Sequence, residues 1–239
     1  MAGAEEGTVV IAETQTKGRG RMGRRWVSSS TRSITFSIVL RPKLHADEMS
    51  EITLSAAVGV AKTLEKWRLK PDIKWPNDLL ISGKKVCGIL TEMGHKKDKI
   101  GTVILGVGIN LNQRPVDFPP ELREKATSLY LASSKRINRK RFFQELLYQL
   151  ETSYELVKER RFSKVLGEWK KRSMTIGRQV KVTQGYRTFF AQVTDVDEKG
   201  ALLLRTDAGM MERLTSGDVE LLKLNQAKPS VGRIGKARS

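Results

Sequence analysis

The sequence is poor in the residues that build disulfide frameworks and metal centres. Its 239 residues include one cysteine, Cys87, and two histidines, so the sequence supports neither an internal disulfide nor a cysteine-rich zinc site. Apolar residues make up 39% of it, and no run approaches the ~18 apolar residues that a membrane-spanning helix requires. The N-terminus also lacks the basic-then-apolar pattern of a secretory signal. These absences predict a cytoplasmic protein in a reducing compartment.

Acidic residues are scarce as well. There are 26 Asp and Glu against 44 Lys and Arg, which gives a net charge of +18 and predicts an anionic ligand or partner. Basic residues cluster over 135–172, where we expect a solvated helix face, and over 17–25, where they alternate with glycines. Glycine lets a backbone approach a ligand closely, and arginine pairs with phosphate. We therefore predict that 17–25 is a mobile loop that closes on an anionic ligand, with a nucleic-acid surface as the alternative.

The spacing of apolar residues divides the chain into an α/β part and a smaller all-β part. Strands are expected at 8–13, 34–40, 72–75, 79–81, 85–90 and 100–109, the first and the last of them buried. Helices are expected at 50–68, from 139 to 157 and at 162–172, with 112–137 as a surface connection of little pattern. After Gly177, short strands separated by glycines predict a barrel of about 45 residues.

The segment from Gly18 to Gly23 satisfies the pattern G-x-G-x-x-G after a predicted strand. A dinucleotide-binding loop needs a helix that begins within it, so that the helix N-terminus faces the pyrophosphate. Here the ten residues 24–33 separate the loop from the next strand, and they include four serines and no helical period. The sequence therefore argues against nicotinamide or flavin binding at this loop.

Four segments, in this order, resemble the catalytic core of biotin–protein ligases. They are 15–26 (QTKGRGRMGRRW), 74–79 (KWPNDL), 85–92 (KVCGILTE) and 106–111 (GVGINL). The resemblance implies an α+β fold whose mixed sheet is related to class II aminoacyl-tRNA synthetases, followed by a small SH3-like β barrel. It places the catalytic core at 1–174, the barrel at 175–224 and a basic disordered tail at 225–239.

The resemblance also implies a two-step reaction. Biotin and ATP, with accompanying Mg²⁺, form biotinoyl-5′-AMP, and a lysine of a biotin carboxyl carrier domain then accepts the biotin. The expected partner is that domain of acetyl-CoA carboxylase or of another biotin-dependent carboxylase. A homodimer that pairs the core sheets is compatible with the sequence. The alternatives are a lipoate-type acyl ligase, an inactive truncated ligase and a basic nucleic-acid-binding module.

The match assigns roles to individual residues. Lys85, Arg21 and Asp78 are the expected catalytic residues, with Lys85 at the biotin carboxylate and the reacting phosphate. The residues expected to bind biotin are Gln15, Gly18, Arg19, Gly20, Arg21, Lys85, Gly88, Gly106 and Ile109. Those expected to bind ATP or the adenylate are Trp26, Lys74, Asn77, Asp78 and Asn110. No dedicated protein metal site is expected, and Cys87 is expected to be a small core residue.

The sequence departs from the family pattern before Val9. In the family, a strand and a helix precede this point, with a Ser-Thr-Asn-like stretch that binds the biotin ureido ring; eight unmatched residues precede Val9 here. A site built for a ureido group loses affinity when polar contacts are missing, so we expect a less stable chain that binds biotin weakly. We also expect no DNA-binding domain and no repressor activity from this chain.

Overall fold

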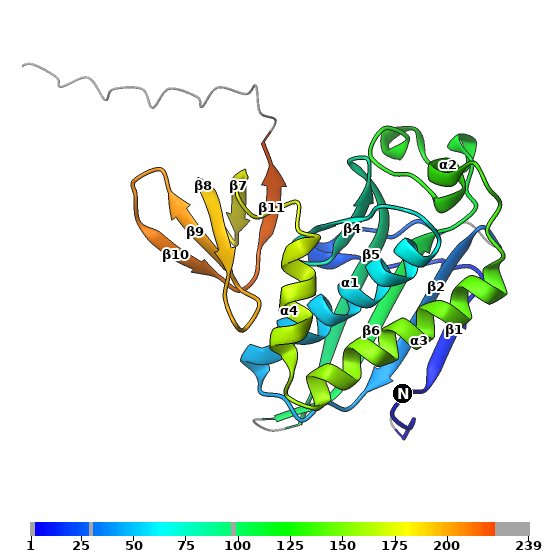
Figure 1. Ribbon diagram of the computed structural model, residues 1–239, viewed down its shortest axis with the longest axis horizontal. Helices are drawn as coiled ribbons and strands as arrows, with labels where there is room; N and C mark the ends of the chain where they lie inside the picture. The colour runs from blue at the N-terminus through cyan, green and yellow to red at the C-terminus, as the bar shows by residue number, and fades with distance from the viewer. Residues whose placement is uncertain (1–2, 29–30, 97–98, 223–239) are drawn as a thin grey trace, which may run out of the picture.

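The computed structural model describes residues 3–28, 31–96 and 99–222, which form two sheets with helices against the larger one (Figure 1). The larger sheet has the order β1-β2-β6-β5-β4-β3, and its neighbouring strands are all antiparallel. Its strands are β1 Val9–Ala12, β2 Ser33–Leu40, β3 Asp72–Lys74, β4 Asp78–Ile81, β5 Lys84–Lys96 and β6 Lys99–Asn110. Among the residues that the structure describes, parallel contacts are confined to isolated bridges, Ile73 with Ser173 and Lys85 with Ala126. The expected α+β core is confirmed, with this small parallel component.

Three helices cover one face of this sheet: α1 Met49–Lys66, α3 Arg139–Lys158 and α4 Phe162–Lys171 (Figure 1). The helix α1 packs against both others and buries most of its residues. It approaches α3 closely at Gly59, where an added Cβ would lie 2.9 Å from the Gln149 carbonyl oxygen. Among the described residues, no helix combines the length and apolar content needed to cross a membrane.

The first strand corrects one expectation. The apolar run at 8–13 predicted a buried strand, but Val9, Val10 and Ile11 of β1 are 37%, 48% and 43% exposed. The reason is position, because β1 is the outermost strand of the sheet and pairs with β2 alone. An apolar run thus identified the strand without identifying its burial.

The connection over 112–137 is also more structured than expected. It contains two 3-10 turns and the helix α2, Leu129–Ser133, and it buries Gln113, Thr127 and Ser128. Its last part runs beside Lys85, whose backbone N–H donates to the Lys125 carbonyl at 2.8 Å and whose carbonyl accepts from the Thr127 N–H at 2.9 Å. These non-local bonds, which the sequence pattern does not indicate, hold the connection against β5.

The second sheet has five antiparallel strands in the order β10-β9-β8-β7-β11. They are β7 Gln179–Gln184, β8 Arg187–Val196, β9 Leu202–Thr206, β10 Met211–Leu214 and β11 Asp218–Leu221. Alternate residues such as Val180, Val182 and Leu204 are fully buried between them. The expected SH3-like unit is confirmed, and its boundaries at 175 and 224 stay predictions. The predicted tail over 225–239 lies outside the described residues.

The small barrel is attached to the core beside the Lys74–Asp78 turn. The indole Nε1 of Trp75 donates to the Gly200 carbonyl at 3.0 Å, and the Trp75 N–H donates to the Thr175 hydroxyl oxygen at 3.0 Å. The hydroxyl of Ser50, on α1, donates to the carbonyl of Lys199. Trp75 is 2% exposed, so these contacts fix the turn from the barrel side.

Candidate functional site

A cavity of about 490 Å³ lies against the larger sheet. Alternate side chains of a strand point to opposite faces, and β2 shows which face this is. The ring of Phe36 packs 5.0 Å from that of Phe143 on α3, so the side chains of Thr35 and Ser37, which also line the cavity, point to the opposite face. The cavity therefore opens on the face away from the helices, and its volume suits a small-molecule ligand.

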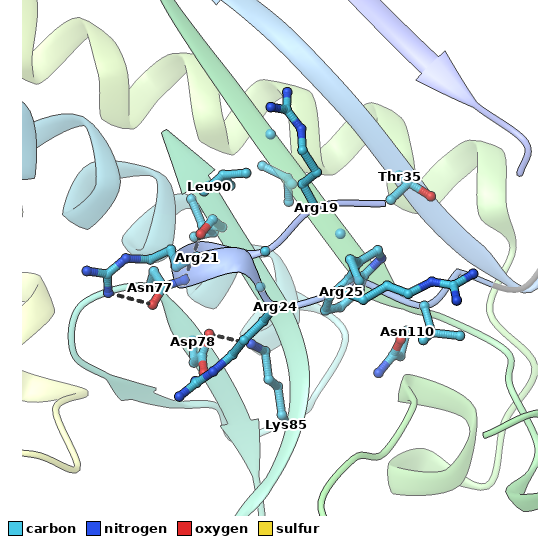
Figure 2. Close-up of a pocket in the computed structure, with 18 of the residues that line it drawn as sticks. Arg19, Arg21, Arg24, Arg25, Thr35, Asn77, Asp78, Lys85, Leu90 and Asn110 are labelled. Atoms are coloured by element: carbon cyan, nitrogen blue, oxygen red, sulfur yellow. Dashed lines mark hydrogen bonds and ion pairs between the residues drawn. The ribbon is translucent and has the colours of Figure 1, made fainter. Parts of the chain in front are cut away.

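The basic segment 17–26, named the arginine loop here, forms one wall of this cavity (Figure 2). The loop closes on itself, because the Trp26 N–H donates to the Gly18 carbonyl at 3.0 Å and the Gly20 N–H to the Arg24 carbonyl at 2.7 Å. A Cβ on Gly18 would lie 2.4 Å from the Trp26 carbonyl oxygen, so only glycine fits this neck. A single 3-10 turn, Arg21–Gly23, follows, and the described residues from Arg24 to Leu44 form no helix.

Trp26 lies flat against two glycines on the floor of the cavity. A Cβ on Gly108 would be 2.4 Å from Cε2 of the indole, and one on Gly88 would be 3.1 Å from Cζ3. The Lys85 ammonium is 5.8 Å from the centre of the Trp26 ring, within the range of a cation–π interaction. The absence of side chains at Gly88 and Gly108 therefore creates the surface on which the indole rests.

Charged groups of opposite sign meet at the end of the cavity nearest the barrel. Nζ of Lys85 lies 2.6 Å from Oδ1 of Asp78, and the Arg21 guanidinium donates to Oδ1 of Asn77 at 3.4 Å (Figure 2). Burial lowers the pKa of Arg21, while the nearby Asp78 and Asp218 carboxylates act against that decrease. These cations are placed to meet an anionic ligand in a partly desolvated setting, where charge interactions are stronger than in water.

Several residues that line this cavity carry a buried polar side-chain atom with no hydrogen-bond partner among the described residues. These atoms are Oε1 of Gln15, Nε1 of Trp26, Oγ1 of Thr35 and Oε1 of Gln113. Such atoms are rare in folded proteins because leaving them unpaired is costly. Four of them on one cavity indicate a ligand that offers both hydrogen-bond donors and acceptors.

Most of the residues expected to form the site lie together. Those lining the cavity are Gln15, Arg19, Gly20, Arg21, Trp26, Lys74, Asn77, Asp78, Lys85, Gly88, Gly106 and Asn110. Two others do not. Gly18 lies at the neck of the arginine loop, and Ile109 is fully buried in the hydrophobic core. Along β6, Gly106, Gly108 and Asn110 alternate with Ile109, so the side chain of Ile109 is directed away from the cavity, and its role in binding biotin stays a prediction.

Other cavity residues were not expected from the sequence. Thr35 and Ser37 come from β2, Gln113 and Lys125 from the 112–137 connection, and Asp218 from the barrel. The alternation of Thr35 and Ser37 with apolar neighbours in β2 was a usable signal. Asp218 carries no such signal, because it is brought to the cavity only by the docking of the barrel.

The described residues contain no group of three or more His, Cys, Asp or Glu side chains arranged to hold a metal ion. Cys87 is fully buried in the core, and burial raises the pKa of its thiol well above the usual range. A buried thiol of this kind is unreactive, in agreement with its expected role as a core residue.

Comparison with known proteins connects both parts of the chain to one family. Residues 1–110 match the family described as Biotin/lipoate A/B protein ligase, and residues 175–222 match the Biotin protein ligase C terminal domain. The Bifunctional ligase/repressor BirA of Bacillus subtilis is 40% identical over 219 residues, which cover 91% of this chain and 67% of that protein. The Biotin–[acetyl-CoA-carboxylase] ligase of Mycobacterium tuberculosis is 32% identical, with 91% and 80% covered.

Solved structures of biotin protein ligases are also similar to this chain. The biotin protein ligase from Aquifex aeolicus in complex with biotin and ATP superimposes with a TM-score of 0.78 at 31% sequence identity. The superposition covers 92% of this chain and 90% of the Aquifex chain. Both the α+β core and the barrel therefore follow the arrangement of that protein.

Proposed function

The chain belongs to the biotin protein ligase family, and on that premise we propose that it is an ATP-dependent ligase that attaches biotin to a protein lysine. The cavity would hold biotin between Gln15, Gly88 and Gly106, and the adenylate between Trp26, Asn77 and Asn110. The observation that carries this proposal is the set of unpartnered polar atoms on the cavity beside Lys85 and Arg21. A ureido ring supplies both donors and acceptors, and a carboxylate and phosphates suit the two cations.

In the first step, a carboxylate oxygen of biotin attacks the α-phosphorus of ATP. A C–O–P bond forms, the bond to the β-phosphate oxygen breaks, and pyrophosphate leaves. Two anions must approach each other in this step, so positive charge fixed at the reacting atoms lowers the barrier. Lys85 is suited to that role because Asp78 holds its ammonium at the cavity. Arg21, held by Asn77, would stabilise the phosphate charge beside it.

In the second step, the neutral amine of an acceptor lysine attacks the acyl carbon of biotinoyl-5′-AMP. An amide bond forms, AMP leaves with the electron pair of the broken C–O bond, and the proton that the amine loses passes to solvent. Asp78 is the carboxylate on the cavity closest to Lys85, and we assign to it the orientation of the incoming amine. The acceptor would be the carrier domain of a biotin-dependent carboxylase.

Magnesium would enter with ATP and supply further charge neutralisation on the phosphates. Asp78 and Asn77 offer oxygen ligands, which suit this hard cation, and Oδ1 of Asp78 is the atom that pairs with the Lys85 ammonium at 2.6 Å. A single carboxylate fits an ion bound chiefly through substrate phosphates.

The proposal is tested by biotin-dependent exchange of labelled pyrophosphate into ATP. Lys85→Ala should lower the exchange rate by about a hundredfold, as removal of one preorganised charge does elsewhere. The matched control is Lys84→Ala, because Lys84 is the neighbouring residue and its ammonium faces Glu124 at 3.3 Å; its exchange rate should stay at the wild-type value. Absence of biotin-dependent exchange in folded wild-type protein would contradict the proposal.

Replacing biotin by lipoate in the same assay separates the two acid substrates that the family description covers. We expect exchange with biotin and little with lipoate, because lipoate lacks the ureido group that would satisfy Gln15 and Thr35. Direct titration with biotin also tests the expectation of weak binding, which a dissociation constant in the range of active relatives would contradict.

A further inference from the structure

The arginine loop is held by contacts from three separate parts of the chain. On the core side, Arg19 pairs with Glu92 of β5 at 3.0 Å, and Arg21 donates to Asn77. On the barrel side, Arg21 also donates to the Gly217 carbonyl at 3.4 Å, and Arg24 forms an ion pair with Asp218. The barrel, almost two hundred residues later in the sequence, therefore contacts the loop directly.

The barrel turn that makes these contacts has a fixed geometry. Gly217 has a positive φ of 153°, and a Cβ there would lie 3.1 Å from the Thr183 carbonyl oxygen. Asp218 is the first residue of β11 and pairs with Thr183 of β7, and the next residue, Val219, is 2% exposed. The carboxylate of Asp218 is thus presented to the loop from a rigid strand end.

The charges explain why the loop needs this contact. Arg19, Arg21, Arg24 and Arg25 lie within seven residues that contain no acid, so they repel one another when the loop is folded over the cavity. Asp218 faces Arg24 directly, and its charge also acts on Arg21. The Asp218 carboxylate is the barrel group that offsets the positive charges of Arg21 and Arg24. Without it, the repulsion between these two arginines would be stronger.

We propose that Asp218 is a positioning residue of the barrel, which keeps the arginine loop closed over the cavity through Arg24, together with the Gly217 carbonyl on Arg21. The functional consequence of this inference rests on the proposed function, because a closed loop protects an acyl-adenylate from water. The closed conformation itself depends only on the contacts described.

Native-state cleavage by trypsin after Arg19 and Arg21, quantified by mass spectrometry, measures opening of the loop without any ligand. Asp218→Asn should increase this cleavage about two- to fivefold, the effect expected from loss of one exposed ion pair. Arg24→Gln should give the same increase, and Asp218→Glu should restore most of the protection. The matched control is Glu220→Gln, an exposed acid on the same strand, which should cleave like wild type.

Equal cleavage of wild type, Asp218→Asn and Arg24→Gln would overturn the proposal. A second measurement follows the loss of preformed, labelled biotinoyl-5′-AMP from the protein without acceptor. Asp218→Asn should lose it about two- to fivefold faster, with a smaller change in the exchange rate. If wild type forms no adenylate, the proposed function fails, and the cleavage comparison still decides the role of Asp218.

Discussion

Lys85 and Asp78 form an ion pair with Nζ 2.6 Å from Oδ1, although the residues come from opposite strands of a hairpin with a shifted register. Asp78 pairs with Gly88 and Leu80 with Lys85, which leaves Val86 as an extra residue in β5. A bulge of one residue reverses the alternation of side chains. Lys85 and Gly88, three positions apart, can therefore both face the cavity, while Val86 and Cys87 are both buried in the core.

This pair predicts that Asp78→Asn damages catalysis more than folding. The amide cannot hold the Lys85 ammonium by charge, so we expect the rate of biotin-dependent pyrophosphate exchange to fall about a hundredfold. The pair is partly exposed, with 35% and 20% of the two side chains accessible, so the free energy of unfolding should change by less than about 1 kcal/mol. Asp72→Asn, on the neighbouring strand β3, is the control and should leave exchange unchanged. Unchanged exchange in Asp78→Asn would remove Asp78 from the mechanism.

The contact of Trp26 with the glycine floor predicts the effect of Gly108→Ala. The added methyl would overlap the indole, which lies 2.4 Å from the Cβ position, so Trp26 must leave its place. We expect the KM for ATP to rise about tenfold, through loss of one aromatic contact, while the KM for biotin changes less. Gly94→Ala on β5 is the matched control, since its nearest atom would be 3.7 Å away. Equal effects on both Michaelis constants would contradict the assignment of Trp26 to the nucleotide.

The sequence was sufficient to predict the strands of the larger sheet, the three long helices and the charged residues at the centre of the cavity, such as Arg21, Asp78 and Lys85. The motif residues of 15–26, 74–79 and 85–92 were assigned through their resemblance to biotin–protein ligases, and within 15–26 the alternation of arginine and glycine is itself a signal. The burial of β1 was predicted wrongly because an apolar run does not reveal whether a strand is central or at the edge. Ile109 was expected to bind biotin, and strand alternation around Asn110 directs its side chain to the core, so any contact with the ligand would come from its backbone.

The remaining cavity residues depend on contacts between distant segments. Gln113 and Lys125 reach the site because their connection pairs with the backbone of Lys85. Asp218 reaches it because the barrel docks on Trp75 and α1. Neither contact follows from local periodicity, so residues of this kind can be found only once the tertiary arrangement is known.

The unpartnered hydroxyl of Thr35 predicts that its removal increases the stability of the protein and decreases its affinity for biotin. Thr35 is 4% exposed, and its Oγ1 is buried without a partner among the described residues. Thr35→Val keeps the shape and removes the unsatisfied group, so the free energy of unfolding should rise by about 1 kcal/mol. Biotin affinity should fall about tenfold, because the ligand loses a polar contact. Denaturant unfolding and biotin titration measure the two effects.

The matched control for Thr35 is Thr63→Val. The hydroxyl of Thr63 is also buried, but it donates to the Gly59 carbonyl at 2.9 Å, so the same change should lower the free energy of unfolding by about 1 kcal/mol. Biotin affinity should not change in this variant. A loss of stability in Thr35→Val like that in Thr63→Val would show that the Thr35 hydroxyl has a partner in the free protein.

Glu51, in the first turn of α1, predicts a pH dependence of stability that is separate from the cavity. Burial, reinforced by the neighbouring Glu48 and Asp47, raises the pKa of Glu51 to about 7, although Arg160 and Lys199 act in the opposite direction. A carboxyl with a raised pKa in the folded state makes stability fall as pH increases from the unfolded pKa of about 4.3 to about 7. Above that range both states are ionised and the penalty is complete.

Glu51→Gln should therefore stabilise the protein at high pH and have little effect at low pH. We expect a gain in the free energy of unfolding of about 1 to 2 kcal/mol, relative to wild type, between about pH 5 and pH 8. The control is Glu168→Gln, because Lys171 and Arg172 lower the pKa of Glu168 to about 2. The Glu168 carboxylate is ionised in the folded and unfolded states throughout this interval. The free energy of unfolding of Glu168→Gln should therefore differ from that of wild type by a constant amount between about pH 5 and pH 8. If the free energy of unfolding of Glu51→Gln also differed from that of wild type by a constant amount across this interval, Glu51 would be solvated in the folded protein. Only a buried carboxyl retains its proton at a pH at which the unfolded chain loses it.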